Sequence, residues 1–181
     1  GRVVRRSGID RGEFFITSKL FPQDYGAEDC GKAIDATLRR LDTDYLDLLL
    51  LHQPYGRYTE AWQVMEEAVA AGKVRSIGLS NFNQAKTQEV LDVASVTPAV
   101  LQVEIHPYWN QHGMKAFLKD RNVTFEAWYP LGHGDATLRG LQLRAQRIAV
   151  GHGLVELRAR DQLPADQRLQ ARRLGLGLGE L

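Results

Sequence analysis

The chain has 181 residues, of which 44% are hydrophobic and 25% charged, and its formal net charge is +1. This balance is typical of a soluble globular protein and provides no electrostatic surface for nucleic acid or an anionic membrane. No run approaches the ~18 apolar residues of a membrane span, no signal pattern is present and Cys30 has no disulfide partner, so we expect a cytoplasmic protein.

The first half of the chain alternates between strand and helix patterns. A β-branched and aromatic run predicts a strand over Phe14–Leu20. The helical spacing of Ile34, Leu38 and Leu41 predicts the helix that follows. A continuous apolar run in Tyr45–Leu51 then predicts a strand that is buried on both faces.

The next helix is predicted to take Thr59 as its N-cap and to stop at Gly72. A short strand over Ser76–Leu79 follows, and then a helix over Gln84–Ala94 with Asn83 as its N-cap. These residues repeat the order of strand and helix seen before them. The strand-helix unit repeats along the chain, but the amino-acid sequences of the units are not repeats of one another.

Two further strands are predicted over Val100–Ile105 and Thr124–Trp128, with a helix around Met114 between them. Apolar strands that alternate with helices form a parallel sheet through right-handed crossovers. At this point two architectures fit the pattern: an open doubly wound sheet or a (β/α)8 barrel.

Polar and aromatic residues mark the C-terminal end of each of the five predicted strands. They are Lys19, His52, Ser80, Asn81, Glu104, His106, Trp128 and Tyr129. A barrel gathers all its strand ends around one pocket, whereas an open sheet favours a glycine-rich phosphate turn that is missing here. We therefore predict an α/β fold of the (β/α)8 class, present in part as about five central units.

The composition changes at Arg139, where the last 43 residues begin. They hold eight basic residues, all arginine, and four acidic ones, and none of the six lysines of the chain. We therefore divide the chain into a partial barrel over 1–138 and an atypical tail over 139–181. For the tail we expect a frameshifted or mis-joined terminus, since an out-of-frame GC-rich gene yields such a composition. A solvated amphipathic helix over Leu163–Leu174 is the alternative.

Ordered motifs in the first 138 residues carry a family resemblance. The strongest are Ile16–Leu20, Leu50–Pro54, Gly72–Phe82 and Gln102–Pro107. Together they resemble the aldo-keto reductases, a family of NADPH-dependent carbonyl reductases on a (β/α)8 barrel. Glu126–Trp128 with the Pro-Leu-Gly turn after it resembles the bacterial branch that includes 2,5-diketogluconate reductases and aldehyde reductases.

The resemblance implies two catalytic residues in this chain, Lys19 and His52. In the family, a hydride passes to the carbonyl carbon while a tyrosine protonates the oxygen. A lysine beside that tyrosine lowers the pKa of the phenol, and a neutral histidine orients the carbonyl by a hydrogen bond. The structural alternatives are a solvated strand-end lysine and a capped loop histidine.

The resemblance also implies a bound NADPH and a small carbonyl substrate. Ser80, Asn81 and Gln102 would hold the nicotinamide carboxamide, and Trp128 would stack on its ring. The pyrophosphate loop would comprise Tyr129, Leu131, Gly132 and His133, and the substrate pocket Phe21, Gln53, Tyr55 and Trp109. The alternatives are a core aromatic for Trp128 and ordinary rim residues for the aromatic pocket positions.

Two parts of the family pattern have no match in the sequence. The catalytic tyrosine and its partner aspartate precede the segment that Gly1–Arg5 resembles, and the set that grips the 2′-phosphate would follow Leu138. We therefore expect an incomplete carbonyl reductase, inactive alone and monomeric when complete, without a metal or nucleic-acid partner. The alternatives are a non-catalytic nucleotide-binding relative and a non-functional truncated product.

Overall fold

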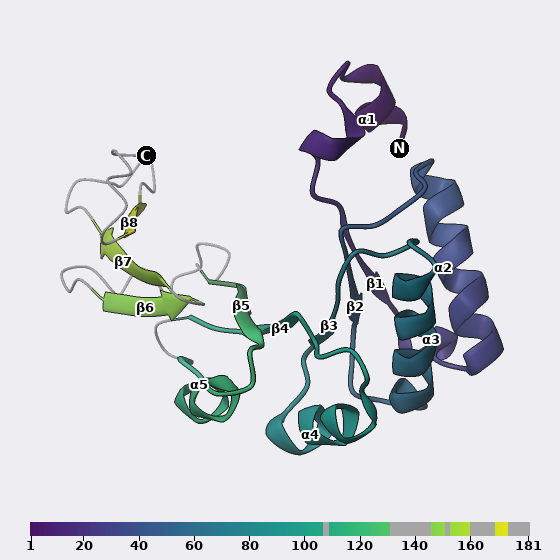
Figure 1. Ribbon diagram of the computed structural model, residues 1–181. Helices are drawn as coiled ribbons and strands as arrows, with labels where there is room; N and C mark the ends of the chain where they lie inside the picture. Colours follow the sequence, from purple (N-terminus) through teal and green to yellow (C-terminus); the bar gives the residue numbers. More distant parts are fainter. Residues whose placement is uncertain (107–108, 131–145, 151–152, 160–168, 174–181) are drawn as a thin grey trace. The chain divides into compact units, whose positions relative to one another are not determined.

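The computed structural model describes residues 1–106 and 109–130, together with the backbone of three later strands at 146–150, 153–159 and 169–173. It consists of two compact units. The first comprises Gly1–Leu101 and Lys119–Val123, and the second comprises Gln102–Leu118 and Thr124–Leu181. The chain passes from one unit to the other inside strand β4, Val100–Glu104 (Figure 1).

Three parallel strands form the centre of the first unit. They are β1 (Thr17–Leu20), β2 (Leu48–Leu51) and β3 (Ile77–Ser80), and β2 pairs with both of the others. Every residue of β2 is buried, as its continuous apolar run predicts, and every residue of β3 is buried as well. The sheet order is β1-β2-β3-β4-β5, where β5 is Thr124–Trp128. The predicted α/β class with parallel strands is therefore confirmed.

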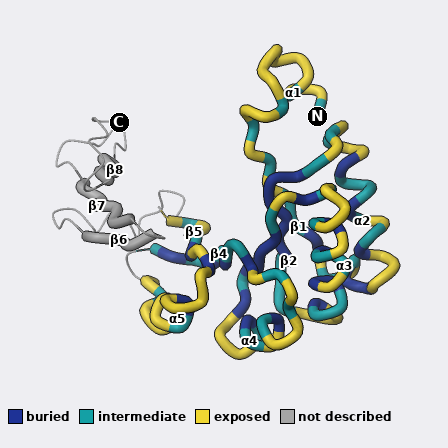
Figure 2. Tube along the Cα trace, viewed as in Figure 1, coloured by how far each residue is buried: buried dark blue, intermediate teal, exposed yellow. Residues whose placement is uncertain are grey.

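Helices cover this sheet and follow the strands in alternation. α2 (Ala27–Leu41) and α3 (Tyr58–Ala70) lie side by side next to β1 to β3, and α4 (Gln84–Val93) follows β3 (Figure 1). Their inner faces are buried, whereas their outer faces are largely exposed (Figure 2). The inward residues are Cys30, Ile34 and Leu38 of α2 and Ala61, Trp62, Met65 and Ala68 of α3.

The helix ends match two of the three predicted caps. Asn83 accepts a hydrogen bond from the Lys86 N–H (2.9 Å), and Gly72 adopts φ +73° just after α3 ends. The prediction for Thr59 is wrong, because the N-cap of α3 is Arg57, two residues earlier, and Arg57 forms no side-chain capping bond. Glycine suits the left-handed conformation at Gly72 because it has no Cβ.

The second unit contains the rest of β4, the helix α5 (His112–Leu118) and the strand β5 (Thr124–Trp128). β5 has the predicted bounds. None of the helices in the described residues has the length and apolar character needed to span a membrane. The first unit also holds the short helix α1 (Arg2–Arg6) and the 3-10 turns η1 (Arg11–Glu13) and η2 (Pro22–Asp24).

Three antiparallel strands lie in the tail: β6 (Gln146–Val150), β7 (Gly153–Ala159) and β8 (Leu169–Arg173). The helical alternative for Leu163–Leu174 is therefore wrong over β8. There the backbone pairs with β7, with Leu157 opposite Ala171, so its hydrogen bonds belong to a sheet ladder and not to helical turns.

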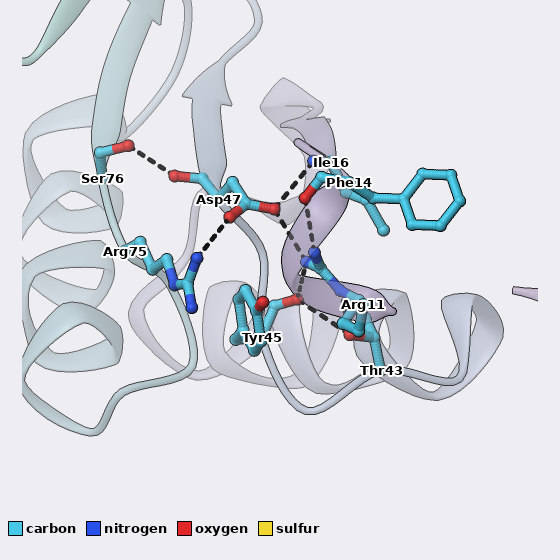
Figure 3. A network of polar contacts seen from close by, with 8 residues as sticks. All are labelled: Arg11, Phe14, Ile16, Thr43, Tyr45, Asp47, Arg75 and Ser76. Carbon is cyan, nitrogen blue, oxygen red and sulfur yellow. Dashed lines mark hydrogen bonds and ion pairs between the residues drawn. The ribbon is translucent and has the colours of Figure 1, made fainter. Parts of the chain in front are cut away.

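A buried carboxylate ties together the amino ends of β1, β2 and β3 (Figure 3). One Asp47 oxygen, Oδ2, accepts hydrogen bonds from the Ile16 N–H and from Arg11, both at 2.9 Å, and Oδ1 accepts from Arg75 at 3.0 Å. The backbone oxygen of Asp47 accepts from the Ser76 hydroxyl at 2.5 Å. The Ile16 N–H thus bonds to a side chain, and β1 starts at Thr17, later than the predicted Phe14.

The two arginines also clasp an aromatic ring. The Tyr45 ring centre lies 3.9 Å from the Arg11 guanidinium carbon and 4.0 Å from that of Arg75. Arg11 further donates to the backbone oxygens of Phe14 and Tyr45 (2.8 and 2.9 Å). The donors of Arg11 therefore have several acceptors besides Asp47, which lowers the cost of holding the arginine partly buried.

We expect Asp47→Ala to lower the free energy of unfolding by about 3 kcal/mol, because it leaves the partly buried Arg11 without its counter-ion. Asp35→Ala is a matched control, since Asp35 pairs with Lys73 at 2.6 Å, but its side chain is 42% exposed against 4% for Asp47. The control should cost less than about 1 kcal/mol. Urea unfolding at pH 7 measures both, and equal losses would contradict the assigned role.

The Asp47 carboxylate should also make the free energy of unfolding depend on pH in the acidic range. Burial alone raises the pKa of Asp47, but the Ile16 N–H and the two arginines outweigh it, so the pKa lies below its usual value. The stabilisation is therefore complete above the unfolded pKa of about 4 and is lost as the pH falls through the folded pKa. The stability difference between the wild type and Asp47→Asn should shrink below about pH 4 and stay constant above it.

Candidate active site

The carboxyl ends of β1, β2 and β3 bring four predicted site residues to one edge of the sheet. In parallel register Lys19 lies opposite Leu50, and Leu51 lies opposite Leu79, so His52 and Ser80 each follow at the same edge. Ser80 is buried, and Lys19, His52 and Asn81 are half-buried. The first unit therefore holds Lys19, His52, Ser80 and Asn81 close to one another.

Asn81 links the strand ends. Its amide Nδ2 donates to the backbone oxygen of His52 (3.0 Å) and to the Ser80 hydroxyl (3.2 Å). The His52 N–H in turn donates to the backbone oxygen of Leu20 (3.0 Å). Asn81 adopts φ +65°, a left-handed conformation that asparagine tolerates better than most residues. The position of His52 is thus fixed from both β1 and β3.

His52 lies in surroundings that favour the neutral imidazole. Burial lowers the pKa of His52, and the positive charge of Lys19 lowers it further. The Phe21 ring meets the imidazole edge to face, with 4.6 Å between ring centres. Within the described residues, Nδ1 of His52 is buried and has no hydrogen-bond partner. A buried polar atom of this kind is a candidate for a bond to a ligand.

Tyr25 holds the backbone just after His52 in place, a role that the sequence did not reveal. Its hydroxyl donates to the backbone oxygen of Gln53 (3.0 Å) and accepts the Gln53 N–H (3.1 Å). Burial, the largest effect, raises the pKa of Tyr25 to about 12. The hydroxyl is therefore committed to the backbone. Two other tyrosines are also engaged by neighbouring side chains. The Tyr58 hydroxyl bonds to Glu89, and the Tyr45 ring lies between two arginines.

The aromatic residues predicted to line the substrate pocket are accessible. Phe21 is 49% exposed and Tyr55 is 65% exposed in the first unit. A groove of about 580 Å³ between β1 and α2 is lined in part by Lys19 and Phe21. His52 does not line this groove, so the groove is not the predicted active-site pocket.

In the second unit, side chains of β4 and β5 pair across the sheet. Gln102 Nε2 donates to Glu126 Oε1 at 2.6 Å. The His106 ring nitrogen lies 3.1 Å from Glu104 Oε1, and the Gln111 amide donates to the Glu104 backbone oxygen (3.2 Å). The predicted cofactor residue Gln102 is thus held by a partner on the neighbouring strand.

Trp128 ends β5 as a partly exposed ring. It is 37% exposed, so the alternative of a core aromatic is wrong. Its ring centre lies 5.9 Å from that of Tyr129, which adopts φ +63° and also meets the His106 ring. Trp109 is 58% exposed.

Leu131, Gly132 and His133 of the predicted pyrophosphate loop lie outside the described residues. Among the residues that the structure does describe, no group of three or more His, Cys, Asp or Glu side chains could hold a metal ion.

Comparison with known proteins finds one family over most of the chain. Residues 1–152 match the model of the aldo/keto reductase family, a range that extends past the predicted boundary at Leu138. The chain is 39% identical over 157 residues to 2,5-diketo-D-gluconic acid reductase B of Corynebacterium sp. (strain SHS752001), covering 85% of this chain and 56% of that protein. It spans about half the length of the curated relatives that it matches.

Solved structures show the same likeness. An aldo/keto reductase from Brucella melitensis superposes with a TM-score of 0.72 at 37% identity, covering 77% of this chain and 56% of the other. A Bombyx mori aldo-keto reductase in complex with NADP superposes with a TM-score of 0.69 at 28% identity, covering 75% of this chain and 47% of the other. The described sheet and helices are therefore part of a (β/α)8 barrel.

We expect the His52 imidazole of the full-length protein to titrate below its ordinary pKa of about 6.5. Lys19→Met should raise that pKa by removing the repulsion between two positive charges. The pKa should stay below 6.5 even then, because burial is the larger cause. An NMR titration of the histidine ring signals, assigned with a His52→Gln variant, measures both. A pKa that is unchanged in Lys19→Met would show that the two side chains do not interact.

Proposed function

The chain belongs to the aldo/keto reductase family, and from that premise we propose that the protein reduces aldehyde or ketone carbonyls to alcohols by hydride transfer from NADPH. The observation that carries the proposal is the buried Nδ1 of His52, which lacks a hydrogen-bond partner among the described residues and lies in surroundings that favour the neutral ring. A neutral imidazole can donate a hydrogen bond to a carbonyl oxygen as negative charge develops there.

The residues present fit a nicotinamide cofactor. Ser80 and Asn81 at the end of β3 in the first unit offer donors and acceptors of the kind that a carboxamide group needs, and so, by itself, does Gln102 on β4 in the second unit. The partly exposed Trp128 offers an aromatic face on which a flat ring can stack. The Bombyx mori relative was solved in complex with NADP, which supports a cofactor of this class for the present chain. When bound, the cofactor supplies the hydride that reaches the carbonyl carbon.

Each side chain then has a separate task. His52 orients the carbonyl oxygen, and its fixed backbone keeps the ring in place during the reaction. Lys19 supplies a positive charge at the same sheet edge, where it stabilises the deprotonated form of the proton donor that the family resemblance implies. Phe21, Gln53, Tyr55 and Trp109 are proposed to contact the substrate. Tyr129, Leu131, Gly132 and His133 are proposed to hold the pyrophosphate.

We also propose the division and surroundings of the protein. Residues 1–138 are proposed to supply the barrel units, and the change of composition at Arg139 supports a distinct tail over residues 139–181. The protein is proposed to be cytoplasmic and monomeric, with a small carbonyl compound as its only partner besides the cofactor. The near-neutral net charge of +1 supports the absence of a nucleic-acid partner.

In the full-length protein, we expect Lys19→Met to lower turnover of a simple aromatic aldehyde at least about 100-fold, because the proton transfer loses its positive charge. The NADPH dissociation constant should change less than about threefold, since Lys19 acts mainly in the transition state. Methionine keeps much of the apolar stem of lysine. Fluorescence quenching measures binding, and steady-state kinetics at saturating NADPH measures turnover.

Gln102→Ala is the complementary variant. It should weaken NADPH binding by up to about tenfold through the loss of a hydrogen bond to the carboxamide. If Lys19→Met keeps most of its turnover, Lys19 is an ordinary strand-end lysine. If the wild-type protein binds no NADPH at micromolar concentration, the proposed function is wrong.

A further inference from the structure

The amide of Gln102 is held in one orientation by its partner on the next strand. Its Nε2 donates to Glu126 Oε1 at 2.6 Å, and both side chains are half-buried between β4 and β5 of the second unit. A carboxylate only accepts hydrogen bonds, whereas an amide has a donor end and an acceptor end. The NH₂ end of Gln102 must therefore face Glu126, and its Oε1 faces away from that carboxylate.

Glu126 has no competing partner in the part of the chain that the structure describes. No cation there forms an ion pair with it, and its hydrogen-bond partner across the strands is Gln102. A second carboxylate, Glu104, lies two residues after Gln102 on β4; it contacts His106, and its backbone oxygen accepts from Gln111. Glu126 is thus devoted to Gln102, and hydrogen bonds to carboxylates are stronger than those between neutral groups.

We infer that Glu126 is a positioning residue for cofactor recognition. It turns the oxygen of the Gln102 amide toward the nicotinamide carboxamide, so that this position reads the NH₂ group of the carboxamide and not its oxygen. The inference rests on the proposed function, because it assumes that Gln102 contacts the nicotinamide. It adds a specificity element that acts through Gln102 and does not itself touch the cofactor.

The inference predicts a change in discrimination between two cofactors. The probes are NADPH and its reduced 3-acetylpyridine analogue, in which a methyl group replaces the carboxamide NH₂. The full-length wild-type protein should bind NADPH more tightly than the analogue by up to about tenfold, the value of one hydrogen bond. In Glu126→Gln the Gln102 amide can turn over, because an amide partner accepts or donates. The preference for NADPH should then fall at least about threefold.

The control is another hydrogen bond from a glutamine amide to a carboxylate, placed away from the predicted cofactor residues. Gln88 donates to Asp92 on α4 at 2.7 Å, so Asp92→Asn changes the same kind of bond and should leave both dissociation constants unchanged. If Glu126→Gln weakens both cofactors equally, Glu126 is only structural and the inference is overturned. If wild-type protein binds neither cofactor, the proposed function fails, and the inference fails with it.

A second variant keeps the test decisive if Glu126→Gln does not fold. The swapped pair, Gln102→Glu with Glu126→Gln, retains one amide-to-carboxylate bond between the strands and still presents an acceptor at position 102. It should keep the preference for NADPH over the analogue. Loss of that preference in the folded swapped protein would overturn the inference, and its retention would support it.

Discussion

A carboxylate withdrawn from water must be surrounded by donors, and the arrangement of the first unit follows from meeting this requirement at Asp47. Asp47 itself precedes β2, and its carboxylate and backbone oxygens accept hydrogen bonds from groups that precede β1 and from groups that precede β3. Fixing the amino ends of three parallel strands in register also fixes their carboxyl ends. Lys19, His52 and Ser80 therefore reach one edge because their strands start together at the other.

The two edges of this sheet differ in how their polar groups are paired. At the amino edge the Asp47 carboxylate forms ion pairs with Arg11 and Arg75, and these ion pairs stabilise the fold. At the carboxyl edge lie Lys19 and the His52 Nδ1, which has no hydrogen-bond partner among the residues that the structure describes, and both can interact with a ligand. The division matches the general behaviour of parallel barrels, in which one face stabilises the fold and the other performs the chemistry.

The sequence predicted those features that depend on local pattern. The structure confirms the Asn83 cap, the position of His52 just after its strand, and a buried strand within the predicted Tyr45–Leu51, although β2 itself covers only Leu48–Leu51. These features follow from capping chemistry, from the proline that ends the strand segment and from a continuous apolar run. The clasp around Tyr45 joins residues far apart in the chain, so no window of sequence contains it. The bonds of Tyr25 to Gln53 and of Gln102 to Glu126 were hidden for the same reason. Thr59 failed because good capping chemistry on its own does not decide where a helix begins.

Cys30 lies on the inner face of α2, within 3.7 Å of the Ala61 backbone oxygen in α3, and burial raises the pKa of its thiol to about 12. In the folded chain the thiolate that reacts with alkylating reagents is therefore both rare and inaccessible. Because it is the sole cysteine of the sequence, any labelled molecule is one in which α2 has separated from α3. The rate at which Cys30 is labelled therefore measures how often this helix pair opens by local unfolding.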